Sequence, residues 1–301
     1  MPQPNFFIAG AAKCGTTAMH EYLSGHPEIF MSDHKEPHFF GSDLEWFDRE
    51  PMTRDHYDGL FLGAGQESIV GESSIFYVYS TLAAEEIREA APDAKILIML
   101  RNPVDMIYSF HSQRVFNGTE DLADFAVALD AEEDRRAGNR LPKNVGLLQG
   151  LYYSELGRFD VQVERFQTAF PKDQIQVLLY DDFRRDTLAA YRSVLNFLGV
   201  DDGYAPDFEV INPNTVNRNQ QLQRLMAGPP AGVQKLYRTL VPNPQWRLRI
   251  GEAIRSFNTR VERRDTLSDS VRTTLSNRLR PSIERLETLI DRDLSAWKVG
   301  G

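Results

Sequence analysis

The chain has 301 residues, of which 42% are hydrophobic and 26% are charged. This composition is ordinary for a globular protein and excludes a disordered or fibrous one. A net charge of −9 argues against a nucleic-acid-binding protein, which needs a basic surface. No stretch approaches the roughly 20 apolar residues of a membrane helix. The only cysteine is Cys14, so no internal disulfide can form. We expect a cytoplasmic protein that is not inserted in a membrane.

Short apolar runs along the chain predict buried strands, and helical patterns separate them. Strands are expected at residues 5–10, 68–72, 95–100 and 174–180, because each run is short and bounded by turn or polar residues. Helices are expected from Thr17, over residues 80–91, from Pro103 towards Gly118, and up to Gly199. This alternation predicts an α/β fold of three layers, like that of P-loop proteins, with a central parallel sheet flanked by helices.

The last third of the chain differs from the first two. After a loop at residues 212–214 it is charge-rich and helical in pattern, and residues 278–294 form the clearest amphipathic helix. No linker-like tract divides the chain. We therefore expect one domain over residues 1–301, with an α/β core over about residues 5–220 and a helical appendage over 221–301.

A glycine-bearing turn joins the first strand to the first helix and forms a candidate anion site. Gly10 and Gly15 let the backbone approach a phosphate, and Lys13 adds a charge next to the helix N-terminus. ATP-binding loops place the lysine directly after the second glycine, whereas Lys13 precedes Gly15, which disfavours an ordinary ATP or GTP hydrolase. The candidate ligand-binding residues of this loop are Lys13, Cys14, Gly15, Thr16, Thr17 and Ala18.

A second candidate phosphate site follows the strand at residues 95–100. Arg101 ends that strand, and Ser109 lies eight residues later in the following helix. Arginine contacts phosphate oxygens in a bidentate manner, and a hydroxyl can complete the cradle. Both candidate sites follow parallel strands, so we expect them to share one crevice at the carboxyl edge of the sheet.

Together the two segments resemble the nucleotide-binding motifs of the PAPS-dependent sulfotransferases. The order K-x-G-T-T-A is similar to the family's 5′-phosphosulfate loop, and the segment with Arg101 and Ser109 is similar to its 3′-phosphate-binding segment. Asn102 departs from the aspartate that is usual in the family. The resemblance implies that PAPS is the sulfate donor, that PAP is released and that no metal is required. It also suggests Arg218 as a further donor contact, from its place late in the core.

Residues 35–40 (KEPHFF) resemble a segment of the heparan-sulfate and related carbohydrate sulfotransferases. The resemblance implies that Glu36 is the catalytic base, that His38 assists it, and that Lys13 stabilises the leaving phosphate. We expect Phe39 and Phe40 to desolvate Glu36 and so make it a stronger base. Two alternatives stay open: His38 or His111 could be the base, and Glu36 with His38 could merely hold a loop together.

One departure from the family bears on the acceptor. Residues 71–74 (GESS) align with a family stretch that carries an active-site lysine, and Ser73 stands in its place. This loss favours a neutral or cationic acceptor over a polyanionic sugar. We expect transfer to a hydroxyl or amine of a carbohydrate, lipid or small metabolite. The alternatives are a P-loop kinase, disfavoured because Arg101 stands where a Mg²⁺-binding carboxylate is needed, and a binder without catalytic activity.

Overall fold

The computed structural model describes residues 2–208, 215–217, 259–261 and 266–298. Its centre is a five-stranded sheet in the order β2-β3-β1-β4-β5, in which all neighbouring strands run parallel. This confirms the predicted fold class. The strands are β1 (Phe6–Gly10), β2 (Ile29–Met31), β3 (Ile69–Ser73), β4 (Lys95–Leu100) and β5 (Ile175–Leu179). Apolar patterning located all of them except β2, which has only three residues.

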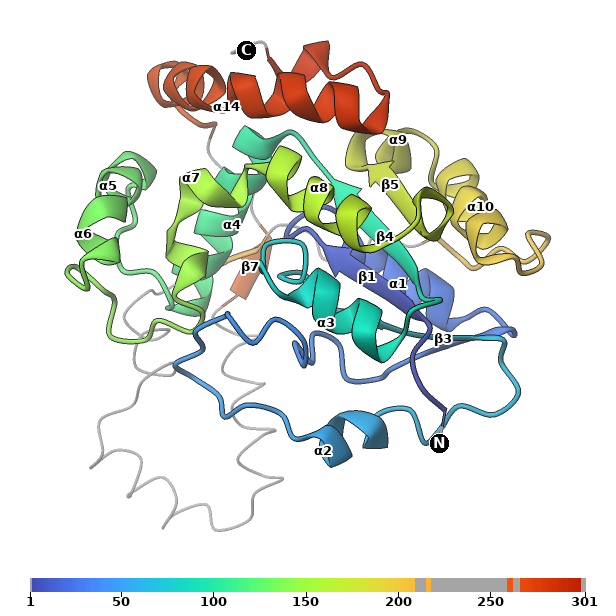
Figure 1. Ribbon diagram of the computed structural model, residues 1–301. Coiled ribbons are helices and arrows are strands. Elements are labelled where there is room, and N and C mark those ends of the chain that lie inside the picture. Colours follow the sequence, from blue (N-terminus) through green and yellow to red (C-terminus); the bar gives the residue numbers. More distant parts are fainter. Residues whose placement is uncertain (1, 209–214, 218–258, 262–265, 299–301) are drawn as a thin grey trace.

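Helices cover both faces of the sheet (Figure 1). Helices α1 and α10 pack on one face, while α3 and α8 lie together on the other. The long helix α14 lies across α8 and α4. No helix in the described ranges is long and apolar enough to cross a membrane. The helices are α1 (Thr16–Ser24), α2 (Arg54–Gly59), α3 (Ala83–Ala90), α4 (Pro103–Asn117), α5 (Phe125–Asp130), α6 (Glu132–Arg136), α7 (Tyr153–Leu156), α8 (Phe159–Ala169), α9 (Tyr180–Arg185), α10 (Thr187–Leu198) and α14 (Asp269–Ile290).

The charge-rich pattern of the C-terminal part predicted helices throughout, but this part also contains a strand. Strand β7 (Thr259–Val261) pairs antiparallel with β6 (Thr215–Asn217). Helix α14 begins earlier and ends earlier than the amphipathic pattern predicted, and it continues through Pro281. Helix α14 packs against α8 and α4 of the core; the division into core and appendage stays a prediction.

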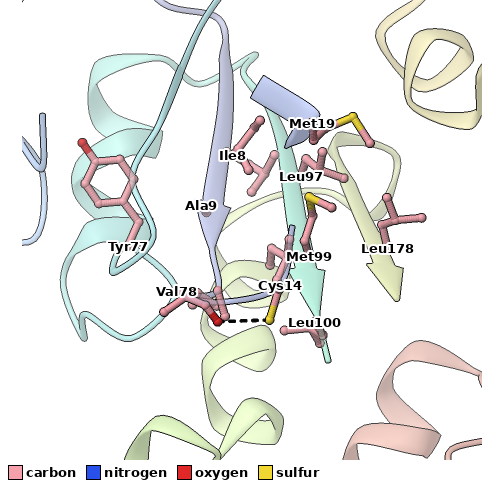
Figure 2. Packing of buried hydrophobic residues seen from close by; sticks show 14 of the residues in the cluster. Ile8, Ala9, Cys14, Met19, Tyr77, Val78, Leu97, Met99, Leu100 and Leu178 are labelled. Atoms are coloured by element: carbon pink, nitrogen blue, oxygen red, sulfur yellow. Dashed lines mark hydrogen bonds between the residues drawn. The ribbon is translucent and has the colours of Figure 1, made fainter. Parts of the chain in front are cut away.

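The core is built on the two central strands. Every residue of β1 is buried, as are the last five residues of β4. Figure 2 shows their side chains packed with Met19 of α1 and with the Cys14 side chain. This fully apolar surrounding explains why both strands read as continuous hydrophobic runs rather than alternating ones.

The order of the strands also places a crevice. From β1 the chain crosses through α1 to β2 on one side, and from β4 it crosses through α4 and α8 to β5 on the other. Strands β1 and β4 are adjacent in the sheet, and the connections that leave their carboxyl ends run in opposite directions. Parallel α/β sheets bind ligands outside the carboxyl ends of the strands at such a switch point.

Candidate active site

The turn with Lys13 and the end of β4 with Arg101 meet at this switch point. The amide of Ala11 donates to the carbonyl of Met99 at 2.7 Å, so the chain after β1 runs beside the last residues of β4. The Cys14 thiol lies close enough to the Arg101 backbone and charge to be affected by both. The two predicted phosphate-binding segments are therefore neighbours, as the sequence indicated.

The turn has a backbone suited to an anion. Lys13 and Gly15 have left-handed φ values of 61° and 90°, and a Cβ at Gly15 would lie 3.1 Å from the Phe183 ring, so only glycine fits. Helix α1 begins at Thr16 without a side-chain cap and without an acidic residue in its first turn. Its first amides and its dipole thus favour a negative charge at this end.

Helix α4 is linked directly to the Lys13 turn. The Lys13 Nζ donates to Gln113 Oε1 at 2.8 Å, which ties the loop to the middle of α4. Ser109 precedes Gln113 by four residues, so both occupy one face of the helix. Ser109 is buried. The Arg101 guanidinium lies 5.0 Å from the centre of the Tyr180 ring, a cation–π contact that restrains it beside the crevice.

Cys14 contributes its backbone and not its side chain to the loop. The thiol is fully buried among core residues and donates to the Ala12 carbonyl at 3.3 Å (Figure 2). Burial raises the pKa of this thiol to about 12, against the opposing effects of Arg101 and Lys13. Cys14 is therefore a neutral packing residue, and its thiol takes no part in binding at the turn.

The segment with Glu36 and His38 lies along the end of β3, next to β1. The Glu36 amide donates to the Ser73 carbonyl at 2.9 Å, and the His38 amide donates to Ser74 Oγ at 3.1 Å. The Ser74 amide in turn donates to the Ile8 carbonyl of β1. The candidate base and the candidate donor loop therefore lie at the same edge of the sheet, where the neighbouring strands β3 and β1 end.

The electrostatics of Glu36 differ from our expectation. Burial alone would raise its pKa, but interactions with His38 and Lys35 outweigh burial and lower it to about 2. Lys35 Nζ lies 2.5 Å from Glu36 Oε1, and His38 Nε2 lies 3.7 Å from Glu36 Oε2. Phe39 stacks on Tyr57 at 4.1 Å between ring centres. Glu36 is thus held ionised rather than made more basic.

His38 is an aromatic-packed imidazole. Its ring centre lies 4.9 Å from that of Trp46 and 5.6 Å from that of Phe76, and neither ring nitrogen has a hydrogen-bond partner within 3.5 Å among the described residues. Burial lowers its pKa, although Glu36 opposes this. Neutral at physiological pH, His38 can accept or donate one proton at the site.

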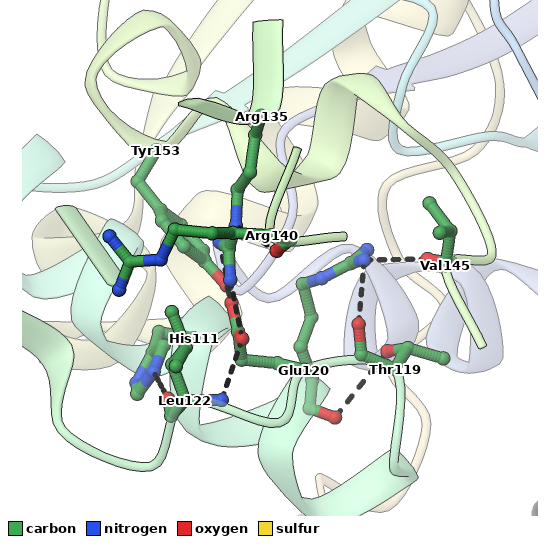
Figure 3. Close-up of polar contacts among 9 residues, drawn as sticks. His111, Thr119, Glu120, Leu122, Arg135, Arg140, Val145 and Tyr153 are labelled. Carbon is green, nitrogen blue, oxygen red and sulfur yellow. Dashed lines mark hydrogen bonds and ion pairs between the residues drawn. The ribbon is translucent and has the colours of Figure 1, made fainter. Parts of the chain in front are cut away.

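His111 lies in a different cluster. His111 lies two positions after Ser109 in the chain, and this spacing places the two residues on opposite faces of α4. Its Nε2 lies 2.9 Å from the Leu122 carbonyl, and its ring packs against Phe125 and Tyr153. Figure 3 shows it beside the buried ion pair of Glu120 and Arg135. The structure does not bring His111 to Glu36, whereas it places His38 Nε2 3.7 Å from Glu36 Oε2. Arg218 lies outside the described residues.

Sequence reasoning missed three side chains near the Glu36 segment, namely Arg49, Trp46 and Glu72. Arg49 lies over the Trp46 ring at 3.5 Å and donates to the Glu36 carbonyl. The third is Glu72, a fully buried carboxylate of β3. Only the run IVGES, a glutamate inside an apolar strand, could have signalled it. Ser73, in the place of the family lysine, is also fully buried, and its Oγ has no partner among the described residues.

Glu72 accepts hydrogen bonds from three hydroxyls. Its Oε1 accepts from Tyr57 at 3.1 Å and Tyr77 at 2.6 Å, and its Oε2 accepts from Ser74 at 2.7 Å. Burial raises the pKa of Glu72 to about 7, because these hydrogen bonds only partly offset desolvation. The charge state of a buried group beneath the site therefore changes near neutral pH.

This pKa predicts a pH-dependent stability. A carboxyl whose pKa is raised from 4.5 to about 7 on folding stabilises most below pH 4.5, and the contribution is lost as the pH rises through 7. Between pH 5.5 and 8.5 the wild type should lose about 2 kcal/mol of unfolding free energy relative to Glu72→Gln. Urea unfolding of both proteins, with the exposed Glu21→Gln as control, measures this difference. Parallel pH profiles for wild type and Glu72→Gln would contradict it.

The fold is that of a three-layer α/β protein in which the Lys13 turn and Arg101 meet at the ends of β1 and β4. A family model described as "Sulfotransferase domain" matches residues 3–220, and the chain belongs to this family. A solved structure, a sulfotransferase from Alicyclobacillus acidocaldarius, is 31% identical, with a TM-score of 0.74, and the match covers 99% of this chain and 100% of that one.

Two curated relatives resemble parts of the chain. Bifunctional heparan sulfate N-deacetylase/N-sulfotransferase 3 of Homo sapiens is 29% identical over 201 residues, which cover 65% of this chain and 22% of that protein. Carbohydrate sulfotransferase 15 of Rattus norvegicus is 27% identical over 253 residues, covering 65% and 44%. The match thus spans less than half the length of either relative.

Proposed function

We propose that this protein transfers a sulfuryl group from PAPS to a hydroxyl or amine of a carbohydrate, lipid or small metabolite and releases PAP. The observation that carries the proposal is the junction of two phosphate-binding segments at the β1/β4 switch point. The Lys13 turn suits the 5′-phosphosulfate, and Arg101 with Ser109 suits the 3′-phosphate that distinguishes PAPS from ATP. Membership of the sulfotransferase domain family supports the same donor.

The residues of the crevice divide the chemistry. PAPS supplies the activated sulfuryl group, and PAP is its leaving group. Lys13 and the N-terminus of α1 provide positive charge where the leaving phosphate gains negative charge. Lys35 is paired with Glu36 Oε1 and must move away before the acceptor can bind there. Glu36 then takes the proton of the acceptor. A neutral hydroxyl in that place lowers the pKa of Glu36 less than the charged Lys35 does, so Glu36 becomes a better base as the acceptor binds.

We propose a neutral or cationic acceptor. The charge of Lys35 is paired with Glu36, and Arg49 lies on Trp46. Ser73 brings no charge and is closed off from solvent. This arrangement offers little uncompensated positive charge for a polyanionic sugar. A screen of hydroxyl and amine acceptors with radiolabelled PAPS would test the acceptor class, and preference for a highly sulfated glycan would contradict it.

Calorimetry with PAP and with ADP tests the donor. PAP should bind at least about 30-fold more tightly than ADP, since a buried arginine–phosphate contact contributes roughly 2 kcal/mol or more. ADP serves as the matched control because it has two phosphates at the 5′ position and none at the 3′ position. Tighter binding of ADP than of PAP would refute the proposal and favour the kinase alternative.

A further inference from the structure

We infer that Glu72 is a positioning residue for catalysis: through the hydroxyls of Ser74 and Tyr77 its carboxylate fixes the backbone of residues 38–40, and so the direction of Glu36. The inference rests on the proposed function, because it concerns the base of that reaction. Glu72 itself lies beneath the site and is fully buried, so it cannot touch an acceptor.

The contacts form two short chains that end on the backbone of the Glu36 segment. Ser74 Oγ donates to Glu72 Oε2 and accepts the amide of His38 at 3.1 Å. The Tyr77 hydroxyl donates to Glu72 Oε1 and accepts the amides of Phe39 at 3.1 Å and Phe40 at 3.4 Å. Three successive amides are therefore held by two hydroxyls that share one carboxylate.

The ionised carboxylate determines the direction of both chains. A hydroxyl has one proton, and a carboxylate can only accept. Both hydroxyl protons therefore point to Glu72, and the hydroxyl lone pairs face the amides of His38, Phe39 and Phe40. A protonated glutamate or a glutamine at position 72 would itself donate a hydrogen bond to one of the two hydroxyls. It would then compete with a backbone amide for the lone pairs of that hydroxyl.

The segment needs such support because its backbone is unfavourable. Glu36 and His38 have left-handed φ values of 62° and 46°. Each such non-glycine residue costs roughly 1 kcal/mol or more, and it persists only where the surroundings enforce it. The two chains from Glu72 and the bond from the Glu36 amide to the Ser73 carbonyl supply this enforcement.

Tyr57 and Tyr77 provide a matched pair for the test. Both hydroxyls donate to Glu72 Oε1, but among the described contacts only that of Tyr77 holds backbone amides. Tyr77→Phe should lower the turnover number about 100-fold, as expected for a displaced catalytic group, with little change in the KM for PAPS. Tyr57→Phe should stay within about threefold of wild type, because it removes a hydroxyl from the carboxylate and none from the segment.

Three measurements make the outcome decisive. Calorimetry should give an unchanged PAP affinity in both variants, and their unfolding midpoints should be similar, since each loses one hydroxyl. Ser74→Ala, which frees the amide of His38, should lower turnover in the same way if Tyr77→Phe fails to fold. Equal activity of the Tyr57 and Tyr77 variants, or wild-type turnover in Ser74→Ala, would overturn the inference. If wild type neither binds PAP nor transfers sulfate, the proposed function itself is wrong.

Discussion

Replacing Glu36 with glutamine should lower the turnover number by about 100- to 10,000-fold, the range typical of a lost general base. Glutamine keeps the shape of the side chain and its hydrogen bond to Lys35, but it cannot take a proton from the acceptor. The affinity for PAP should stay within about threefold, because Glu36 lies in the loop after β2, beside the end of β3, and not in the donor-binding turn between β1 and α1. Turnover with saturating PAPS, together with PAP calorimetry, measures the two quantities separately.

Glu21→Gln is a suitable control for this variant. Glu21 is an exposed carboxylate of α1, so its loss changes the net charge equally and should leave turnover unchanged. Retained turnover in Glu36→Gln would move the base elsewhere. His38 would be the next candidate, since both ring nitrogens are unpartnered among the described residues. His111 would follow only if the cluster around Glu120 opened.

The low pKa of Glu36 gives the same assignment a pH test. With a pKa of about 2 in the folded protein, Glu36 remains ionised throughout the range in which enzymes are assayed. An acid limb near neutral pH would therefore report another group. Glu72, whose pKa is about 7, is the expected source, because its protonation would disturb the amides of residues 38–40 while Glu36 is still charged.

Much of the fold could be predicted from the sequence because its signals are local. Continuous apolar runs marked β1 and β4, and Pro103 and Gly118 marked the ends of α4. Strand β2 escaped because three residues give no periodicity. Strand β7 escaped because its pairing with β6 joins segments far apart in the chain. The early start of α14 was missed because capping and charge patterns locate helix ends poorly.

The sequence predicted which edge of the sheet carries the candidate site, but not the electrostatics of that site. Motif spacing brought Lys13, Arg101 and Glu36 to one edge of the sheet, as parallel topology requires. Two sets of contacts had no signal in the local sequence: Lys13 with Gln113, and Glu72 with its three hydroxyls. The second set depends on residues spread from β3 to α2, so only the folded chain reveals it.

Backbone strain is a further property that the sequence hides. Among the described residues, non-glycine positive φ values occur at Lys13, Glu36, His38, Arg140 and Asp291. Three of these five are the candidate catalytic residues. Strained backbone of this kind clusters at functional sites, where the surroundings hold groups in positions they would not otherwise adopt. Its coincidence with residues chosen on other grounds supports their assignment.

The 3′-phosphate assignment predicts that Arg101→Ala will weaken PAP binding by about 30- to 1,000-fold, the usual effect of truncating a charged phosphate contact. AMP has the same base and 5′-phosphate but no 3′-phosphate, so its affinity should change by less than about threefold. The Arg101 side chain is already restrained over Tyr180, so little entropy is lost when it binds, and its removal should show mainly in PAP affinity. Its backbone beside Cys14 remains in the variant.

Two further variants distinguish a direct contact of Arg101 with the 3′-phosphate from a general effect of lost charge or of a changed loop structure. Arg88→Ala removes an exposed arginine paired with Glu85 on α3 and should leave both affinities unchanged. Lys13→Met should weaken PAP and AMP alike, because both carry the 5′-phosphate that the turn is expected to bind. If Arg101→Ala weakened AMP as strongly as PAP, Arg101 would act by shaping the Lys13 turn. If Arg101→Ala lost affinity for PAP alone, Arg101 at the end of β4 would bind the 3′-phosphate, and the turn after β1 would bind the 5′-phosphate.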